Sequence, residues 1–303
     1  MKPSYIELFE SKRLIRVYEK LLSLLESCKL CPRGCKVNRL RGEKGFCSIG
    51  KEAVVSSFFA HFGEEKELVG RYGSGTIFFA GCNLKCIYCQ NYQISILGEG
   101  TPTQAEQLSK MMLYLQDIGC HNINFVTPTH VLPQIIESLL LAIPQGLRIP
   151  LVYNCGGYES LEVIRLIEGV FDIYMPDVKY FSPEVSWKYS HVRDYWQVCT
   201  QVLKEMYAQV GNLKTDAQGI ASRGLIIRHL VLPNLIEESF KILEFISHHI
   251  SPDCYVNIMP QYRPCFKAFE DELINRRITL QEYSKVIKYA LRLGLRRGFP
   301  HNL

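Results

Sequence analysis

The sequence has no apolar run long enough to cross a bilayer, and residues 1–17 carry charges throughout instead of the apolar core of a signal peptide. It also lacks a dominant charge, because 35 Lys and Arg against 30 Asp and Glu give a formal charge of +5 in 303 residues. This small, dispersed excess does not mark a nucleic-acid-binding or membrane surface. We therefore expect a cytoplasmic protein with no membrane partner and no nucleic-acid partner.

Cysteine, by contrast, is abundant. The chain has twelve, and seven of them fall in two tight groups with ligand-like spacing. Scaffolds held by disulfides are usually much smaller than 303 residues, so we expect reduced thiols that bind metal.

Six short β-rich runs alternate with helical stretches in the larger part of the chain. They are residues 76–80, 122–127, 151–154, 171–175, 225–232 and 254–259. Strands that alternate with helices predict βαβ units and a parallel sheet. Six such repeats predict an α/β fold in the form of a partial barrel.

Several local signals place the remaining elements. Apolar spacing predicts one amphipathic helix within residues 5–27, a short extended stretch at 53–60 and a surface loop or hairpin at 211–224. Helix starts are predicted by Thr103 with Glu106, by Thr279 with Glu282, and by Ser182 before a proline. We expect two units: residues 1–70, with a helix and a Cys-rich irregular module, and residues 71–303, with the barrel.

Three thiols, those of Cys82, Cys86 and Cys89, follow the first predicted barrel strand. Barrel enzymes keep their chemistry at this end of the strands. Thiolates suit iron-sulfur clusters, and a four-iron cluster with three protein ligands leaves one iron open. The alternatives are ordinary buried cysteines or a zinc knuckle, but no fourth Cys or His follows at a suitable spacing.

The CxxxCxxC spacing, with the aromatic Tyr88 before its last cysteine, resembles the radical S-adenosylmethionine (SAM) superfamily. The wider stretch 75–92 is similar to the subgroup related to the pyruvate formate-lyase activating enzyme. The resemblance implies a partial (β/α)6 radical SAM barrel over 71–303. It also implies a [4Fe-4S] cluster that cleaves SAM to methionine and a 5′-deoxyadenosyl radical.

The resemblance implies partners as well. These are an electron donor such as flavodoxin or ferredoxin, and a protein, peptide or small-molecule substrate from which the radical takes hydrogen, including a glycyl-radical enzyme. The sequence assigns no catalytic side chain.

Five residues are expected to hold SAM by resemblance to relatives: Tyr88, Thr127, Asn154, Asp177 and Lys179. Lys179 would pair with the SAM carboxylate and Asp177 would orient it or hold a cation. Where relatives carry Gly-Gly-Glu for the SAM amino group, this chain has residues 126–130, so Thr127 or Thr129 would supply the acceptor. The alternatives are a tight turn at Thr127 and a surface ion pair at Lys179.

The roles of three further residues stay open. Arg228 and His229 interrupt the apolar fifth strand, which favours a lumen role, although His229 is as readily explained as a hydrogen-bonded core residue. Cys155 adjoins the expected pocket, whereas a free cysteine elsewhere is commonly a small core residue.

A second cysteine group precedes the first, in a segment too poor in apolar residues to fold unaided: Cys28, Cys31, Cys35 and Cys47. Four thiolates predict structural zinc or a second [4Fe-4S] cluster. In activating enzymes of glycyl-radical proteins, extra clusters follow the SAM motif. The position of this group, together with the altered residues 126–130, weighs against that activity.

Two other functions compete with SAM chemistry. An iron-sulfur electron carrier would use both cysteine groups but would not need six βα units. A zinc-organised RNA-binding module would use the basic residues around the second group, although such a run is usually a solvated face. Those residues are Lys36, Arg39, Arg41, Lys44 and Lys51.

Overall fold

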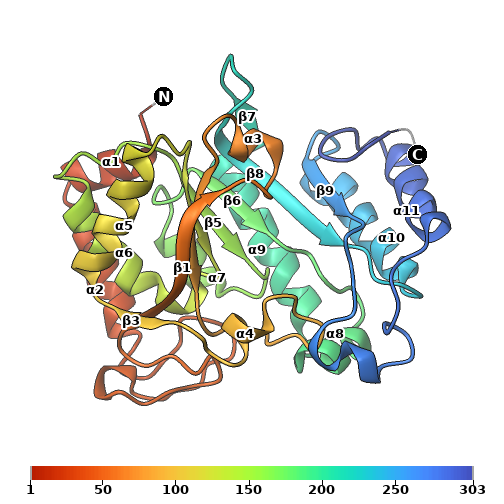
Figure 1. The fold of residues 1–303 in the computed structure, drawn as a ribbon, viewed down its shortest axis with the longest axis horizontal. Coiled ribbons are helices and arrows are strands. Elements are labelled where there is room, and N and C mark those ends of the chain that lie inside the picture. The colour runs from red at the N-terminus through yellow and green to blue at the C-terminus, as the bar shows by residue number, and fades with distance from the viewer. Residues whose placement is uncertain (1, 302–303) are drawn as a thin grey trace.

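The computed structural model describes residues 2–301 and contains one nine-stranded sheet. The strand order is β3-β1-β2-β4-β5-β6-β8-β7, and β9 also pairs with β8 (Figure 1). The strands are β1 (Ala53–His61), β2 (Ser74–Phe79), β3 (Thr101–Thr103), β4 (Ile123–Val126), β5 (Leu151–Cys155), β6 (Ile173–Pro176), β7 (Lys214–Thr215), β8 (Ala221–Leu230) and β9 (Tyr255–Met259).

Six of these strands, β2, β4, β5, β6, β8 and β9, run parallel, as the alternating pattern predicts. Strand β1 adds to the β2 edge in the antiparallel direction, and β3 pairs antiparallel with β1. Segment 211–224 contains β7 and turns back into β8 as a hairpin. The prediction of an α/β partial barrel is confirmed.

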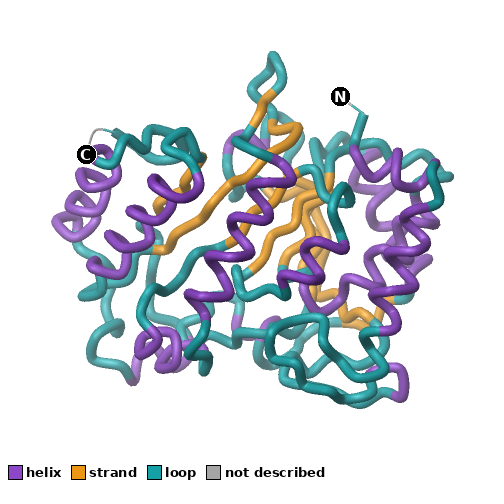
Figure 2. Tube along the Cα trace, turned by 180° about the vertical axis from the view of Figure 1, so that it is seen from behind, coloured by secondary structure: helices purple, strands orange, loops and turns teal. Residues whose placement is uncertain are grey.

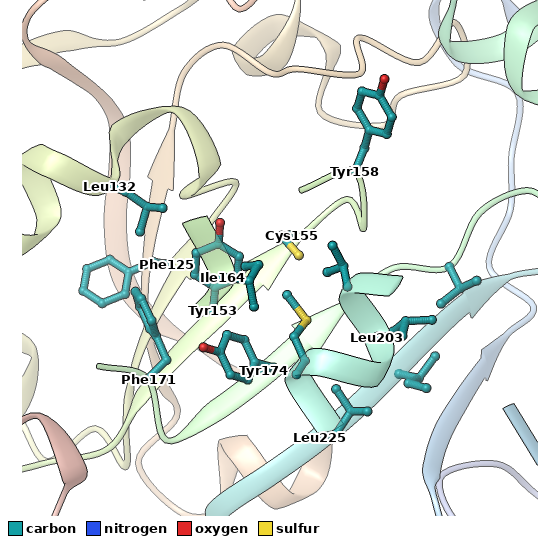
Figure 3. Close-up of a cluster of buried hydrophobic side chains, with 14 of the residues drawn as sticks. Phe125, Leu132, Tyr153, Cys155, Tyr158, Ile164, Phe171, Tyr174, Leu203 and Leu225 are labelled. Carbon is teal, nitrogen blue, oxygen red and sulfur yellow. The ribbon is translucent and has the colours of Figure 1, made fainter. Parts of the chain in front are cut away.

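The α-helices are α1 (Ser4–Glu10), α2 (Arg13–Ser23), α3 (Lys66–Val69), α4 (Tyr92–Ser95), α5 (Ala105–Asp117), α6 (Leu132–Ala142), α7 (Leu161–Leu166), α8 (Pro183–Ser190), α9 (Tyr195–Val210), α10 (Ile236–Phe245) and α11 (Leu280–Arg292). Figure 2 shows the sheet face that the helices cover. The core beneath them includes Phe125, Tyr153, Phe171 and Tyr174, which pack edge-on or tilted (Figure 3).

Two local predictions are wrong. The single N-terminal helix is two helices, because Lys12 takes a left-handed conformation (φ 57°) that ends α1; the apolar periodicity continues through α2 and does not reveal this break. Helix α5 begins after Gln104, which forms a capping box with Gln107, since Thr103 lies in β3. The Thr279–Glu282 capping box is confirmed.

The opposite, inner side of the barrel is closed at its amino-terminal end by α3. Leu68 of this helix packs in a small buried cluster with apolar side chains from four strands, among them Val152, Ile173, Met175 and Ile226. The carboxyl ends of the parallel strands point to the lower edge in Figure 1, where α4, α8 and segment 28–50 gather. The loops at this lower edge therefore build the site. Strand β1, which lies within residues 1–70, belongs to the same sheet as the barrel strands. The division of the chain into two units at residue 70 stays a prediction.

Within residues 2–301, no helix is long and apolar enough to span a membrane.

Candidate metal and cofactor site

The three thiols of the loop after β2 each accept a hydrogen bond. Cys86 Sγ accepts from Ser190 Oγ at 3.0 Å, Cys89 Sγ from Ser95 Oγ at 3.1 Å, and Cys82 Sγ from the backbone N–H of Leu84 at 3.4 Å. A hydrogen bond donated to sulfur stabilises the thiolate form, which is the form that binds metal. Burial nevertheless raises the pKa of Cys82 to about 12, so a bound metal must supply the remaining stabilisation of its thiolate. This set of donors fits a cluster with three protein ligands.

A glycine brings this loop against the second cysteine group. Gly81 has φ +81°, and a Cβ atom at this position would lie 2.5 Å from the carbonyl oxygen of Cys47. Only glycine tolerates both the conformation and the contact.

Opposite the thiols, the ends of β6 and β8 place three charged side chains in contact. Lys179 Nζ lies 2.6 Å from Asp177 Oδ2, and Arg228 Nε lies 2.8 Å from Asp177 Oδ1. The three side chains are only 16–19% exposed. A solvated surface ion pair, the alternative for Lys179, is therefore excluded.

The pKa values of this cluster reflect its pairing. Burial opposes ionisation, but Arg228 and Lys179 lower the pKa of Asp177 to about 2. Asp177 in turn raises the pKa of both cations against the effect of burial. All three groups are ionised at neutral pH.

Two of the three thiols and the charged groups line one cavity of about 230 Å³. Its walls include Cys86, Cys89, Tyr88, Asp177, Lys179 and Arg228. A larger hollow of about 980 Å³ lies at the other end of the barrel, between α3 and residues 296–301. We assign the site to the smaller cavity, since it joins two cluster thiols to the buried ion pairs.

The other predicted SAM residues surround this cavity in different ways. Tyr88 lies edge-on to Tyr180, Tyr189 and Tyr262, with ring centroids 5.9–6.3 Å apart. Asn154 Oδ1 accepts a 2.7 Å hydrogen bond from Arg228 Nη2 and so joins the charged cluster.

Thr127, like Asn154, lies outside the set of described residues that line the cavity. It ends β4 in a left-handed conformation (φ 60°), which is rare for a β-branched residue, and its N–H donates to Asn154 O. Thr129 is buried and donates to Glu159 at 2.9 Å. Thr129 therefore acts away from the cavity.

Two residues near the expected pocket have structural roles instead. Both ring nitrogens of His229 are hydrogen-bonded, Nδ1 to Val178 O and Nε2 to Ser239 Oγ, so the core interpretation is confirmed. Cys155 lies in the core beside Tyr153 and Tyr174, not in the cavity (Figure 3).

Three residues of the site, Glu64, Ser190 and Arg33, are not predicted from the sequence. Glu64 Oε2 lies 3.2 Å from Arg228 Nη1, behind the charged cluster. In the sequence, Glu64 belongs to a run of charged residues of the kind that is usually exposed to solvent. Arg33 donates to three backbone carbonyls at 2.8 Å each, those of Asn83, Ser190 and His191. It thus links the second cysteine segment to both the loop after β2 and the end of α8.

The second cysteine group surrounds a cavity of its own, lined by Cys28, Cys31, Cys35 and Cys47 together with Arg39 and His130. Burial raises the pKa of Cys31, to about 12, and of Cys47; the neighbouring thiols add to both shifts. Within residues 2–301, no three Cys, His, Asp or Glu side chains are already gathered closely enough to hold a metal ion.

The family model of the radical SAM superfamily matches residues 76–212. The chain is also 35% identical over 283 residues to the uncharacterized protein MJ0674 of Methanocaldococcus jannaschii, a match that covers 90% of this chain and 77% of that protein. The chain belongs to the radical SAM superfamily. Membership implies a [4Fe-4S] cluster and SAM as cofactors.

Two more distant similarities were found. The uncharacterized protein MJ0808 of the same organism is 33% identical over 92 residues, 26% of this chain and 27% of that protein. The crystal structure of Streptococcus suis SuiB is similar with a TM-score of 0.48 and 12% identity; the match covers 73% of this chain and 47% of that chain.

Proposed function

We propose that this chain reductively cleaves SAM at a [4Fe-4S] cluster held by Cys82, Cys86 and Cys89. The observation that carries the proposal is the shared cavity, in which two of these thiols face the buried Asp177 and Lys179. A cluster held by these thiols would supply one electron to the sulfonium of SAM, and the cleavage would give methionine and a 5′-deoxyadenosyl radical able to take hydrogen from a substrate.

Lys179 binds the carboxylate of SAM in this proposal. Arg228 is held by Asp177 and by Glu64, so the two cations share Asp177 within the cavity. Arg228 faces two carboxylates and Lys179 faces one, so the ammonium of Lys179, which lines the cavity, is the cation better placed to bind an incoming carboxylate. Asp177 fixes the direction of the ammonium group, and Asn154 fixes that of Arg228.

Tyr88 and Thr127 are the remaining residues of the proposed SAM-binding site. Tyr88 is buried and lines the cavity next to Cys86 and Cys89, so its ring excludes water from the cluster side. The left-handed backbone of Thr127 is a strained conformation of the kind that persists at ligand sites, and it supports a contact with the SAM amino group.

In this proposal the substrate is a protein, a peptide or a small molecule that gives up hydrogen from a C–H bond. The reductant is a flavodoxin- or ferredoxin-type donor. A glycine of a glycyl-radical enzyme is the narrower candidate, supported by the Asp177-Val178-Lys179 element. It is tested by mixing this protein with a glycyl-radical enzyme, SAM and a reductant, because activation would give a protein-based radical signal that the Cys86→Ala variant does not produce.

We also propose that Cys28, Cys31, Cys35 and Cys47 hold a second metal centre, zinc or iron-sulfur. Their shared, buried cavity supports this.

The experiment that tests the main proposal measures methionine and 5′-deoxyadenosine after anaerobic reduction with dithionite in the presence of SAM. We expect both products from the wild type and from Cys120→Ala, a control in a buried cysteine outside both groups. Cys86→Ala should form neither. Intact SAM beside a reduced cluster in the wild type would instead support the electron-carrier function.

A further inference from the structure

Arg39 is fully buried, at 0% exposure, whereas the basic residues that follow it, Arg41, Lys44 and Lys51, are exposed. Its Nε donates to Gly50 O at 2.9 Å. Neither Nη1 nor Nη2 has a hydrogen-bond partner among residues 2–301. Arginine stays protonated in proteins, and a buried, unpaired charge is strongly destabilising. The protein therefore needs an anionic acceptor beside this guanidinium.

The four-cysteine cavity is where that acceptor would lie. Arg39 lines it together with the four thiols. His130 lines it as well. The His130 Nε2 atom lies 2.8 Å from Ala80 O, and because a carbonyl only accepts, Nε2 carries the hydrogen. Nδ1 is then an acceptor, buried and without a partner in the described part of the chain.

The number of available donors separates the two metal centres that four thiols allow. One of the thiols already accepts a backbone N–H: Cys35 from Phe46 at 3.3 Å. The two Nη atoms of Arg39 carry four more N–H bonds that need acceptors. Zinc would offer no acceptor beyond the four thiolate sulfur atoms, whereas a [4Fe-4S] cluster adds its sulfide atoms to them.

We infer that Cys28, Cys31, Cys35 and Cys47 hold a second [4Fe-4S] cluster whose sulfur atoms accept hydrogen bonds from Arg39. The inference deepens the proposed function by naming the second centre, but it does not depend on SAM cleavage. Hydrogen bonds from a buried cation stabilise the more negative, reduced state of such a cluster.

The first test uses the full chain with Cys82, Cys86 and Cys89 all replaced by Ala, prepared without oxygen, so that only the second group can bind metal. We expect about 4 Fe and about 4 sulfides per chain, and a spin-resonance signal on reduction that ignores SAM. Zinc in place of iron, or no metal in this variant together with less than about 8 Fe in the wild type, would overturn the inference.

The second test isolates Arg39. In the Arg39→Gln variant we expect the SAM-insensitive signal to persist with a lower midpoint potential. Arg41→Gln, an exposed arginine in the same 3-10 turn (Arg39–Arg41), serves as the control and should leave the potential unchanged. Equal midpoint potentials in both variants would show that Arg39 does not donate hydrogen bonds to the cluster. Because neither test measures SAM products, failure here is distinct from failure of the proposed cleavage.

Discussion

The hydroxyl group of Ser190 donates a hydrogen bond to the sulfur of Cys86 across 3.0 Å. Its oxygen lies 2.7 Å from the hydroxyl of Tyr180. Since the single Ser190 proton points to sulfur, Tyr180 is the donor in the second contact. The end of α8, about 100 positions along the chain, thus orients a ligand of the loop after β2.

Ser190→Ala should retain the SAM cluster but hold it about tenfold more weakly and at a lower midpoint potential, because the thiolate of Cys86 loses its donor. The measurement is a redox titration followed by spin resonance. Ser186→Ala is the matched control, since this serine of the same helix donates to Pro183 O instead. An unchanged potential in Ser190→Ala would show that the hydrogen bond does not tune the cluster.

Arg33→Lys should release iron from the SAM cluster roughly tenfold faster on exposure to a chelator. A lysine cannot bridge three carbonyls as the planar guanidinium does, nor stack on Phe46, whose ring centroid lies 3.7 Å from Arg33 Cζ. Arg41→Lys, an exposed substitution nearby, should behave as the wild type. Equal release rates in both variants would contradict a positioning role for Arg33.

Lys179→Ala should weaken SAM binding by about 2 kcal/mol, roughly 30-fold in Kd, without loss of iron. The variant removes the cation proposed to bind the SAM carboxylate but none of the cluster ligands. Calorimetric titration of SAM into anaerobic protein measures the change. The control is Lys241→Ala, a half-exposed lysine paired with Glu244 on α10. If both variants bind SAM as the wild type does, Lys179 is not part of the SAM site.

Glu159 should make stability depend on pH. Burial raises its pKa in the folded protein from 4.5 to about 7, although Tyr153 and Thr129 donate to the carboxylate and oppose the rise. The folded state then holds a proton that the unfolded state loses above pH 4.5. The resulting stability is complete below about pH 4.5 and is lost as pH rises through about 7.

Glu159→Gln removes this titration. Between pH 5 and pH 8, the free energy of unfolding of the variant should therefore rise relative to that of the wild type, by up to about 3 kcal/mol. Thermal denaturation of both proteins across this range provides the measurement, and the difference between them cancels effects of pH on the metal centres. Parallel curves would mean that the carboxyl group is not protonated in the folded state.

Local patterns were enough to predict the six parallel strands and the placement of Asp177 and Lys179 at a strand end, because strand alternation and strand-end motifs are short-range signals. The partners of these residues were not predictable. Glu64 reaches Arg228 only because α3 closes the barrel, and this contact joins positions 164 apart in sequence.

The same limit applies to Arg39 and His130. In sequence, Arg39 belongs to a basic run of the kind that is usually solvated, and His130 follows a turn. Their burial around the four thiols depends on how segment 28–50 folds back over the end of β2. Cys155 shows the opposite error, since its position near a strand end suggested the cavity but its side chain points into the core.

The most direct test of the central claim is the spin-resonance spectrum of the anaerobically reduced protein before and after addition of SAM. We predict that SAM changes the spectrum of the wild type and leaves that of Cys86→Ala unchanged, because the open iron binds SAM only when the loop after β2 holds its cluster. A wild-type spectrum that is the same with and without SAM, in protein that carries iron, would contradict the assignment of Cys82, Cys86 and Cys89 to a SAM-binding cluster.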